Sequence, residues 1–337
     1  MDLESIILDS KNSPKGFLIK NKQFINYLIK NINLIYGVRG QELVYPAPQP
    51  VSIEKKDFKK LEEYNYYVSL KLDGVRFLLY FIKDKNGNNQ AILINRALNF
   101  YIIKIQAEDN IYSGTLLDGE LIYNSESENW VFYVHDALML CGNKINRLQH
   151  SIRLSDSRYC LDSFLTYNDN STLDIKIKDF YPFNNFKYFI DDIYNLSDNN
   201  DGIIFMPENL PVISGTQYSM LKWKPIDKHT FDFLIKESDI GMEAHVFHMG
   251  NIELFAKVHK NTVEGSKFIN LANNLNNYKN ESIIECFFDK EKNNFIPFLV
   301  RTDKTHPNSL RTIERTLYNI QENITIDDFK EINIKKV

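Results

Sequence analysis

One lysine of this chain, Lys71, stands where an apolar strand pattern meets a glycine turn, in the segment Lys71-Leu-Asp-Gly-Val-Arg76. A lysine amine can attack phosphorus and form a covalent intermediate, but only as the free amine. An ordinary lysine has a pKa of about 10.4 and is almost fully protonated at neutral pH, so the chemistry needs burial or nearby cations. The segment therefore predicts that other basic residues converge on Lys71. A surface lysine beside a turn is the alternative interpretation of so short a pattern.

Further charged segments suit a nucleoside triphosphate and a metal ion. Asp118-Gly-Glu120 and Asp201-Gly202 place carboxylates beside glycines, which we expect to form turns where the backbone approaches a nucleotide. Lys222 and Lys224 are two residues apart on a strand pattern and should share one face, where a phosphate would separate their charges. Carboxylates together with phosphate oxygens are hard ligands, so the expected ion is Mg²⁺ or Mn²⁺.

The elements that must position these charges follow from the hydrophobic pattern. Alternating apolar residues predict strands at residues 66–70, 75–83, 91–95, 101–105, 115–123, 130–140, 173–180, 203–206 and 219–224. A turn at Asn86-Gly87 should join the second and third of these strands as a hairpin. Helical spacing predicts helices at 24–35, 58–63 (capped by Ser52), 145–167, 186–196 and 310–321. Residues 45–50, with three prolines, should form a stiff extended connector.

The chain changes character near residue 233. Short β segments at 243–249, 252–259, 283–288 and 295–300 predict a small barrel of the oligonucleotide-binding (OB) type. We therefore expect an α+β protein in which a domain of antiparallel sheets with helices, residues 1–232, precedes an OB-fold β-barrel domain, residues 233–337. The last residues can pack back on the first domain.

Composition excludes several classes of protein. The formal net charge of −4 and the pI near 6.0 exclude a generally basic nucleic-acid coat, so a polyanion must be met by local Lys and Arg clusters. Three widely spaced cysteines fit a reducing compartment, and no zinc-ligand spacing occurs; His245 and His248 read as strand residues. The acidic first residues, without a long apolar core, argue against a secretory signal, and no stretch predicts a membrane span. The expectation is a soluble intracellular protein, with nucleus and cytoplasm both open.

Five segments in order resemble the motifs of covalent nucleotidyltransferases, the family of DNA ligases, RNA ligases and mRNA-capping guanylyltransferases. They are Lys71-Leu-Asp-Gly-Val-Arg76, Leu117-Asp-Gly-Glu-Leu121, Asp201-Gly-Ile-Ile-Phe205, Leu221-Lys-Trp-Lys-Pro225 and Arg301-Thr-Asp-Lys304. The resemblance covers about residues 50–328 and implies an ATP-grasp-like nucleotidyltransferase domain before the OB fold. Three features look like the capping branch of this family: the stretch around Arg96, the lysine pair followed by the stretch around Asp232, and residues 301–308. The stretches 50–58 and 322–327 are especially similar to compact single-subunit capping enzymes of large DNA viruses.

The resemblance implies a two-step mRNA guanylyltransferase reaction. Lys71 would attack the α-phosphate of GTP, release pyrophosphate and pass the lysyl-bound GMP to the 5′ diphosphate end of RNA, forming the cap. The family roles fall on the matching positions as follows: Arg76 and Glu120 on the ribose, Arg96 on ribose and phosphate, Lys222 and Lys224 on the α-phosphate, Asp201 and Glu120 at the metal, Arg301 with Asp303 and Lys304 at the pyrophosphate, and Asp232 in the GTP site.

Two base-recognition positions depart from the family pattern. His135 stands where capping enzymes usually have Phe or Tyr stacked on guanine. Imidazole can stack, while the plain alternative is a core histidine with Tyr133 or another ring in that role. Lys187 is the candidate for reading guanine O6.

Two rival functions remain open from the sequence. One is an ATP-dependent DNA or RNA ligase with a lysyl-AMP intermediate, and the other is a catalytically inactive nucleotide- or RNA-binding relative. For the capping function the implied partners are GTP, 5′-diphosphate RNA, a separate RNA triphosphatase and cap methyltransferase, and the transcription machinery, without a membrane. Because Lys71 and Arg301 fall in different expected domains, a hinge should close for the first step and open for RNA.

Overall fold

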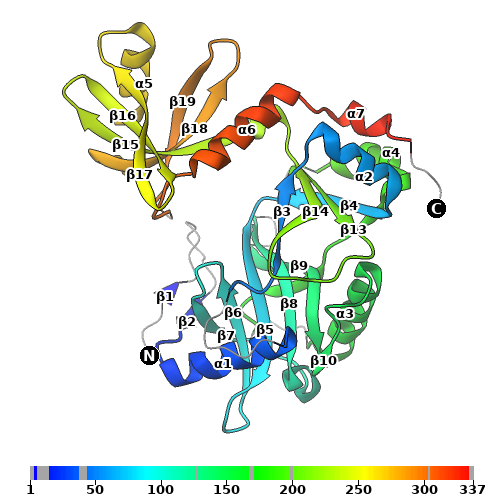
Figure 1. Cartoon of the computed structure of the whole chain (residues 1–337). Coiled ribbons are helices and arrows are strands. Elements are labelled where there is room, and N and C mark those ends of the chain that lie inside the picture. The colour runs from blue at the N-terminus through cyan, green and yellow to red at the C-terminus, as the bar shows by residue number, and fades with distance from the viewer. Residues whose placement is uncertain are drawn as a thin grey trace. The chain divides into compact units, whose positions relative to one another are not determined.

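A computed structural model describes residues 4–5, 15–37, 44–125, 128–166, 171–197, 200–302 and 304–333 of the chain. The chain divides into two compact units, each described here by itself (Figure 1). The first comprises Met1–Ile53, Asp57–Trp223 and Lys330–Val337, and the second comprises Glu54–Lys56 and Lys224–Phe329.

The larger sheet of the first unit has the strand order β1-β2-β7-β6-β5-β8-β9-β10, with β11 beside β9. Its strands are β1 (Glu4–Ser5), β2 (Lys15–Leu18), β5 (Val75–Lys83), β6 (Asn89–Asn95), β7 (Phe100–Ile103), β8 (Thr115–Asn124), β9 (Asn129–Leu140), β10 (Asn143–Lys144) and β11 (Asp174–Ile177). The predicted hairpin of β5 and β6 is confirmed, and Gly87 has the positive φ of +84° that its turn requires.

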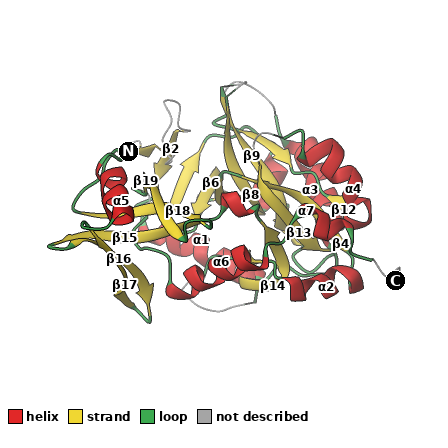
Figure 2. Ribbon diagram, turned by 90° about the horizontal axis from the view of Figure 1, so that it is seen from above, coloured by secondary structure: helices red, strands yellow, loops and turns green. Residues whose placement is uncertain are grey.

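Each face of this sheet is buried by a helix. Alternate residues of β5 divide between the faces: Phe77 and Leu79 belong to one apolar cluster with Leu161 of α3 (His150–Phe164), while Leu78 packs in a second cluster with α1 (Lys22–Ile35). The sheet therefore forms the middle layer between α1 and α3 (Figures 1 and 2). Because neither face of its central strands meets solvent, those strands read as nearly continuous apolar runs.

A second, five-stranded sheet of the same unit has the order β12-β4-β13-β14-β3. Its strands are β3 (Pro48–Ser52), β4 (Tyr66–Leu72), β12 (Tyr181–Pro182), β13 (Asn200–Pro207) and β14 (Gly215–Trp223). The stretch predicted as a connector therefore contributes an edge strand, β3, which pairs in parallel with β14. The predicted cap Ser52 is wrong, because it ends β3, and α2 (Phe58–Glu63) begins after Asp57.

One tight turn carries the chain between the two sheets. Strand β4 ends at Leu72, Asp73 and Gly74 turn, and β5 begins at Val75. A Cβ atom on Gly74 would lie 2.6 Å from the carbonyl oxygen of Leu121, so only glycine fits here. Lys71 and Arg76 are five residues apart in sequence but belong to different sheets.

Two predicted helices of the first unit differ from their expected form. The helix expected at 145–167 is the shorter α3, and the one expected at 186–196 begins as α4 (Phe186–Tyr188) and continues as the π-helical η4 (Phe189–Tyr194). Short 3₁₀ segments occur at Lys55–Asp57, Asp109–Ser113, Phe183–Asn185 and Ile226–Lys228.

The second unit is built on one antiparallel sheet of order β17-β16-β15-β18-β19. Its strands are β15 (Thr230–Ser238), β16 (Gly241–His248), β17 (Asn251–His259), β18 (Glu281–Asp289) and β19 (Asn294–Val300). Its apolar cluster includes residues of α5 (Val263–Asn273) and α6 (Leu310–Glu322). Sequence analysis missed α5 and the short α7 (Ile326–Lys330). The α+β class with antiparallel sheets is confirmed, whereas the closed OB barrel stays a prediction.

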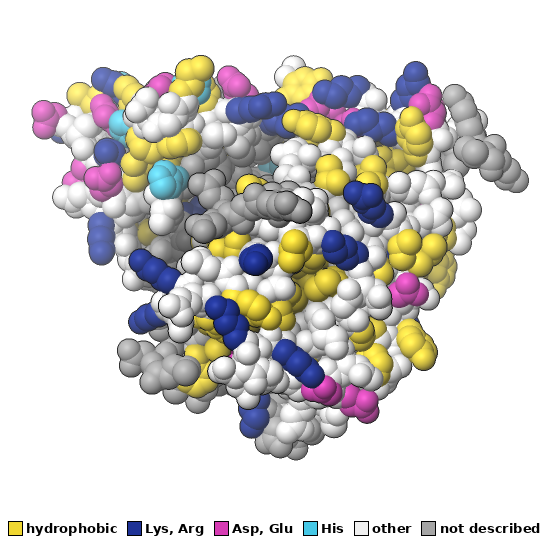
Figure 3. All heavy atoms as spheres, turned by 60° about the horizontal axis from the view of Figure 1, so that its bottom comes forward, with side chains coloured by type: hydrophobic (Ala, Val, Ile, Leu, Met, Phe, Trp, Pro, Cys, Tyr) yellow, Lys and Arg dark blue, Asp and Glu magenta, His cyan; other side chains and the backbone are white. Residues whose placement is uncertain are grey.

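The surface agrees with the modest net charge of the chain. On the face drawn in Figure 3, Lys and Arg side chains are spread among uncharged and apolar ones and do not merge into a basic coat. None of the described helices combines the length and the apolar character needed to cross a membrane.

Candidate active site

The predicted nucleophile, Lys71, is held by a carboxylate from the neighbouring strand. Its Nζ atom lies 2.5 Å from Oδ2 of Asp201, and both side chains are mostly buried. Asp201 and Gly202 do not form the predicted turn: they lie within β13, where the register with β4 shifts between Asn200 and Ile203. This bulge re-aims the Asp201 side chain.

A second ion pair lies on the larger sheet. Arg76 donates from Nε to Oδ1 of Asp118 at 2.9 Å and from Nη2 to Oδ2 at 2.5 Å. The predicted site residue His135 places its Nε2 3.2 Å from the same Oδ2. Burial by itself would raise the pKa of Asp118, but Arg76 and His135 beside it hold that pKa well below its usual range. The sequence pattern placed Asp118 only beside Glu120 and did not predict its contacts with Arg76 and His135.

Strand register explains why these groups meet. Arg76 lies opposite Glu120 and Leu78 lies opposite Asp118, so Arg76, Asp118 and Glu120 share one face of the sheet. On the other side of β8, Asp118 pairs with Asp136 and Gly119 pairs with Val134, which leaves His135 as an extra, bulged residue.

Gly119 corrects a second turn prediction. It lies inside β8, where a Cβ atom would stand 2.5 Å from Cζ of Phe132 and 2.6 Å from the carbonyl oxygen of Tyr133. The absence of a side chain here accommodates strand β9 and is not explained by approach to a nucleotide.

Glu120 belongs to the same charged group. Burial raises the pKa of Glu120, and His135 and Arg76 beside it counteract part of this effect. The charges of Lys178 and Lys71 act on Glu120 in the same direction. Cations of both sheets therefore act on the pKa of this carboxylate.

Lys178 is a site residue that sequence analysis missed. It follows β11, and its backbone N–H donates to the carbonyl oxygen of Val134 at 2.8 Å. Burial lowers the pKa of Lys178 to about 7; Glu120 opposes this effect, whereas Lys71 and Arg76 add to it. A lysine at the end of the predicted strand 173–180 was the available signal. We call Lys71, Arg76, Asp118, Glu120, His135, Lys178 and Asp201 the Lys71 group.

Helix α3 supports this group from behind. Arg153 of α3 donates to both carboxylate oxygens of Asp136, at 2.6 and 2.8 Å, and this pair is almost completely buried. His150, at the start of the same helix, has its Nε2 3.1 Å from the carbonyl oxygen of His135. Two contacts thus join the bulge at His135 to α3: the carbonyl oxygen of His135 contacts His150, and the side chain of Asp136 binds Arg153.

Three other predicted site residues have separate positions in the first unit. Lys222 lies opposite Ile204 and Ile204 lies opposite Ser69, so Lys222 shares the face of β4 that carries Lys71. Arg96 is exposed in the turn after β6. Lys187 is exposed on α4, and no contact described for it joins it to the Lys71 group.

The remaining predicted site residues belong to the second unit. Asp232 accepts from Arg301 at 3.3 Å and forms an ion pair with Lys304. Nδ2 of Asn308 donates to Asp232 at 3.0 Å, and Arg301 also contacts Glu285 at 3.2 Å. We call these five residues the Asp232 group; sequence analysis missed the part played by Glu285.

Two predicted residues near this motif need separate mention. Lys224 is the first residue of the main segment of the second unit, directly after β14. Asp303 lies outside the described residues.

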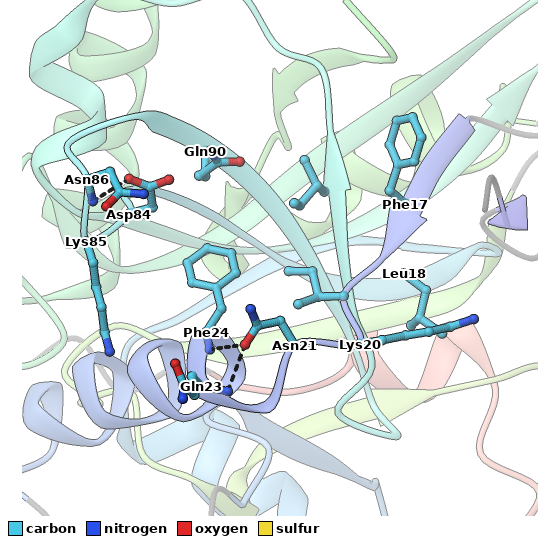
Figure 4. A pocket seen from close by; sticks show the side chains of 12 residues that line it. Phe17, Leu18, Lys20, Asn21, Gln23, Phe24, Asp84, Lys85, Asn86 and Gln90 are labelled. Atoms are coloured by element: carbon cyan, nitrogen blue, oxygen red, sulfur yellow. Dashed lines mark hydrogen bonds between the residues drawn. The ribbon is translucent and has the colours of Figure 1, made fainter. Parts of the chain in front are cut away.

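A pocket of about 650 Å³ in the first unit is lined by other residues. Phe17 and Leu18 of β2, Asn21 and Phe24 at the start of α1, and Asp84 of the β5–β6 turn contribute to it (Figure 4). Its lining includes none of the predicted site residues. Within the described ranges, no group of three or more His, Cys, Asp or Glu side chains is placed to hold a metal ion by itself.

Comparison with known proteins identifies the relatives of this chain. The family model "mRNA capping enzyme, catalytic domain" matches residues 10–226, and the model "mRNA capping enzyme, C-terminal domain" matches residues 224–329. The mRNA-capping enzyme subunit alpha of Schizosaccharomyces pombe is 30% identical over 333 residues, which cover 86% of this chain and 80% of the relative.

More distant relatives are also named mRNA-capping enzymes. The mRNA-capping enzyme subunit alpha of Saccharomyces cerevisiae is 24% identical, with 86% of this chain and 78% of the relative covered. The mRNA-capping enzyme of Danio rerio is 24% identical, with 83% of this chain and 48% of the relative covered. Among solved structures, a mycobacterial DNA ligase D complexed with ATP is similar at a TM-score of 0.42 and 11% identity, covering 80% of this chain and 97% of the ligase.

Proposed function

The chain belongs to the mRNA capping enzyme family, and from this premise we propose that it transfers GMP from GTP to the 5′ diphosphate end of RNA through a covalent intermediate on Lys71. The observation that carries the proposal is the Lys71 group itself. Two sheets bring Lys71, Arg76, Glu120 and Lys178 close enough for their charges to act on one another. Such convergence is what an amine nucleophile for phosphorus needs.

The first step forms one bond and breaks another. The Nζ lone pair of Lys71 attacks the α-phosphorus of GTP, a P–N bond forms, and the bond to the β-phosphate oxygen breaks. Pyrophosphate leaves with the bonding electrons, and the amine loses a proton. In the second step, a terminal phosphate oxygen of the RNA attacks the same phosphorus, and the P–N bond breaks to restore the lysine.

Asp201 controls the state of the nucleophile in this proposal. At 2.5 Å its carboxylate is in direct contact with the Lys71 amine. The ammonium group must lose its proton before attack, and Asp201 is the acceptor already in contact with it. The ion pair therefore has to be broken when the nucleotide binds.

The nucleotide contacts are assigned to residues of both sheets. Arg76 and Glu120, opposite one another across β5 and β8, would hold the ribose. His135, presented by the bulge of β9, would stack on the base. Lys178, partly buried beside Glu120, is a better candidate for a polar contact to the nucleotide than the exposed Lys187. Arg96 would contact ribose and phosphate from the turn after β6.

A divalent metal ion, Mg²⁺ or Mn²⁺, fits this site only together with substrate. The described residues offer the carboxylates of Asp201 and Glu120, and Mg²⁺ commonly binds through one or two carboxylates plus phosphate oxygens. When bound, the ion would neutralise charge developing on the phosphates.

The phosphate contacts would come from Lys222 and from the second unit. Lys222 and Lys224 are assigned to the α-phosphate, and Arg301, Lys304 and Asp303 to the departing pyrophosphate. Asp232, placed by sequence analysis in the GTP site, would instead orient Arg301 and Lys304, because both contact it. Closure of the units for the first step and opening for RNA stay part of this proposal.

The wider setting is also a proposal. The RNA triphosphatase and cap methyltransferase activities would come from separate proteins, and transcription machinery would supply the RNA. The proposed domains are residues 1–232 and 233–337. The similarity to viral capping enzymes, and action in the nucleus or cytoplasm, stay predictions.

Covalent labelling tests the proposed function. Purified protein is incubated with α-³²P-GTP or α-³²P-ATP and Mg²⁺ or Mn²⁺, then separated by denaturing electrophoresis, with pyrophosphate added to half of each sample. We expect a GTP-specific label that pyrophosphate removes. Lys71→Ala should lower the rate of labelling by about 10³-fold or more, as for the loss of other catalytic nucleophiles. Lys59→Ala, which changes an exposed lysine of α2 in the same unit, is the matched control and should keep its label. Labelling by ATP would contradict the proposal and favour a ligase; no label from either nucleotide would favour an inactive binding protein.

A further inference from the structure

Tyr45 is a buried residue of the first unit that the proposed reaction does not yet use. It precedes β3, is 6% exposed, and packs in the apolar cluster that contains Leu78 and Leu138. Within the part of the chain that the structure describes, its hydroxyl has no hydrogen-bond partner. A buried hydroxyl without a partner has lost its hydrogen bonds to water without compensation, so such groups are rare and call for an explanation.

The charges around this hydroxyl are those of the proposed ribose site. Cζ of Arg76 lies 5.7 Å from the centre of the Tyr45 ring. The charges of Asp118, Arg76, Arg96 and Glu120 all act on the phenol. Burial is the largest effect and raises its pKa, with Asp118 adding to it, so the hydroxyl keeps its proton and can donate.

The main chain holds this ring in a defined position. The carbonyl oxygen of Tyr45 accepts from Oγ of Ser214 at 3.0 Å and from the N–H of Ala47 at 2.9 Å. The next carbonyl, that of Pro46, accepts from the Tyr36 hydroxyl at 2.6 Å. The Tyr45 hydroxyl is therefore preset, and a ligand that binds it gains the contact without ordering a loop.

The chemistry of the neighbours selects the class of ligand group. Asp118 and Glu120 would repel a phosphate oxygen placed beside them. A sugar hydroxyl can donate to the Glu120 carboxylate while it accepts from Tyr45, so it satisfies both groups at once. We propose that the Tyr45 hydroxyl donates a hydrogen bond to a ribose hydroxyl of the bound nucleotide and so contributes to selection of ribonucleotides. This inference rests on the proposed function.

The test compares sugars as well as variants. The rate of enzyme–GMP formation is measured with GTP, 2′-deoxyGTP and 3′-deoxyGTP for wild type, Tyr45→Phe and Tyr112→Phe. The control, Tyr112, is also buried in the first unit, but its hydroxyl donates to the carbonyl of Ile105 at 2.9 Å. Ratios of kcat/KM between sugars do not depend on the folded fraction of a variant, so a loss of stability cannot imitate the effect.

For Tyr45→Phe with GTP we expect kcat/KM to fall about two- to tenfold, mainly through KM, as for loss of one neutral hydrogen bond. With the deoxynucleotide that lacks the bonded hydroxyl, wild type and Tyr45→Phe should become equal. Tyr112→Phe should leave all three ratios unchanged.

The failures of inference and function are distinguishable. If wild type is labelled by GTP and Tyr45→Phe shows no loss, or the same loss with all three sugars, the inference about Tyr45 is overturned while the proposed function stands. If wild type forms no lysyl adduct with GTP, the proposed function falls and the inference falls with it.

Discussion

The two units carry charged groups of similar composition but different surroundings. In the Lys71 group, the residues lie on or directly beside strands of two sheets, and the central carboxylate, Asp118, has an exposed fraction of zero. In the Asp232 group, the carboxylate is buried, but its cations come from the segment after β19 and stay partly exposed: the side chains of Arg301 and Lys304 are 22% and 32% exposed. The Arg76–Asp118 pair is enclosed, whereas the cations of the Asp232 group border solvent.

This difference bears on how each group can act. Breaking a buried pair leaves an unsolvated charge, so Arg76 and Asp118 stay together and define a preset surface. A partly exposed cation can leave its carboxylate at small cost because water replaces the partner. Arg301 and Lys304 can therefore exchange Asp232 for a phosphate, whereas Arg76 and Asp118 provide a fixed part of the proposed site.

The largest expected effect is on the enclosed group. Asp118→Ala removes the partner of a buried guanidinium and should lower the free energy of unfolding by about 3–5 kcal/mol. Urea-induced unfolding followed by circular dichroism measures it. The matched control is Asp109→Ala, which breaks a solvent-exposed pair with Lys83 and should lower the free energy of unfolding far less. Equal losses in the two variants would show that burial does not distinguish these pairs.

An intermediate effect is expected in the second unit. Asp232→Ala removes the acceptor of Arg301, Lys304 and Asn308, but the two cations can be solvated, so we expect a loss of about 1–2 kcal/mol. The same unfolding measurement applies, with the exposed pair variant Glu281→Ala as control. A loss as large as that of Asp118→Ala would remove the contrast between the groups.

The smallest expected effect concerns pH. The pKa of Lys178 is about 7 in the folded protein, against about 10.4 for an ordinary lysine in the unfolded chain. Between these pH values the unfolded chain binds a proton that the folded protein does not bind, so this lysine makes the free energy of unfolding rise with pH. This contribution to stability is complete above the unfolded pKa and is lost as the pH falls toward 7.

Unfolding at pH 7 and pH 9 tests this sign. Wild type should gain on the order of 1 kcal/mol relative to Lys178→Met between the two pH values. Lys176→Met changes an exposed position of β11, the strand that Lys178 follows, and its stability should depend on pH as that of wild type does. If the free energy of unfolding changed equally with pH in wild type and Lys178→Met, burial would not lower the pKa of Lys178 as described.

Local patterns predicted most strands because each depends on neighbours in sequence. The hairpin at Asn86-Gly87 follows from one dipeptide whose glycine tolerates positive φ. Helix α5 escaped notice because residues 263–273 are rich in polar residues and only part of the helix is buried. The turns expected at Gly119 and Gly202 are strand positions. Gly119 leaves room for the neighbouring strand β9, and Gly202 has a φ of +132° beside the change of register in β13.

By itself the sequence determined the order of the motifs, the family resemblance that the comparisons confirm, and the presence of a lysine between a strand and a glycine turn. Only the tertiary structure decided which charges meet. The turn at Asp73 and Gly74 sends β4 and β5 into different sheets, and register then places Arg76 opposite Glu120. The pairing of Lys71 with Asp201, 130 residues away, depends on a bulge, and the position of Lys178 near Glu120 depends on how β11 joins β9. Such contacts arise from strand pairing over long separations, which no local pattern encodes.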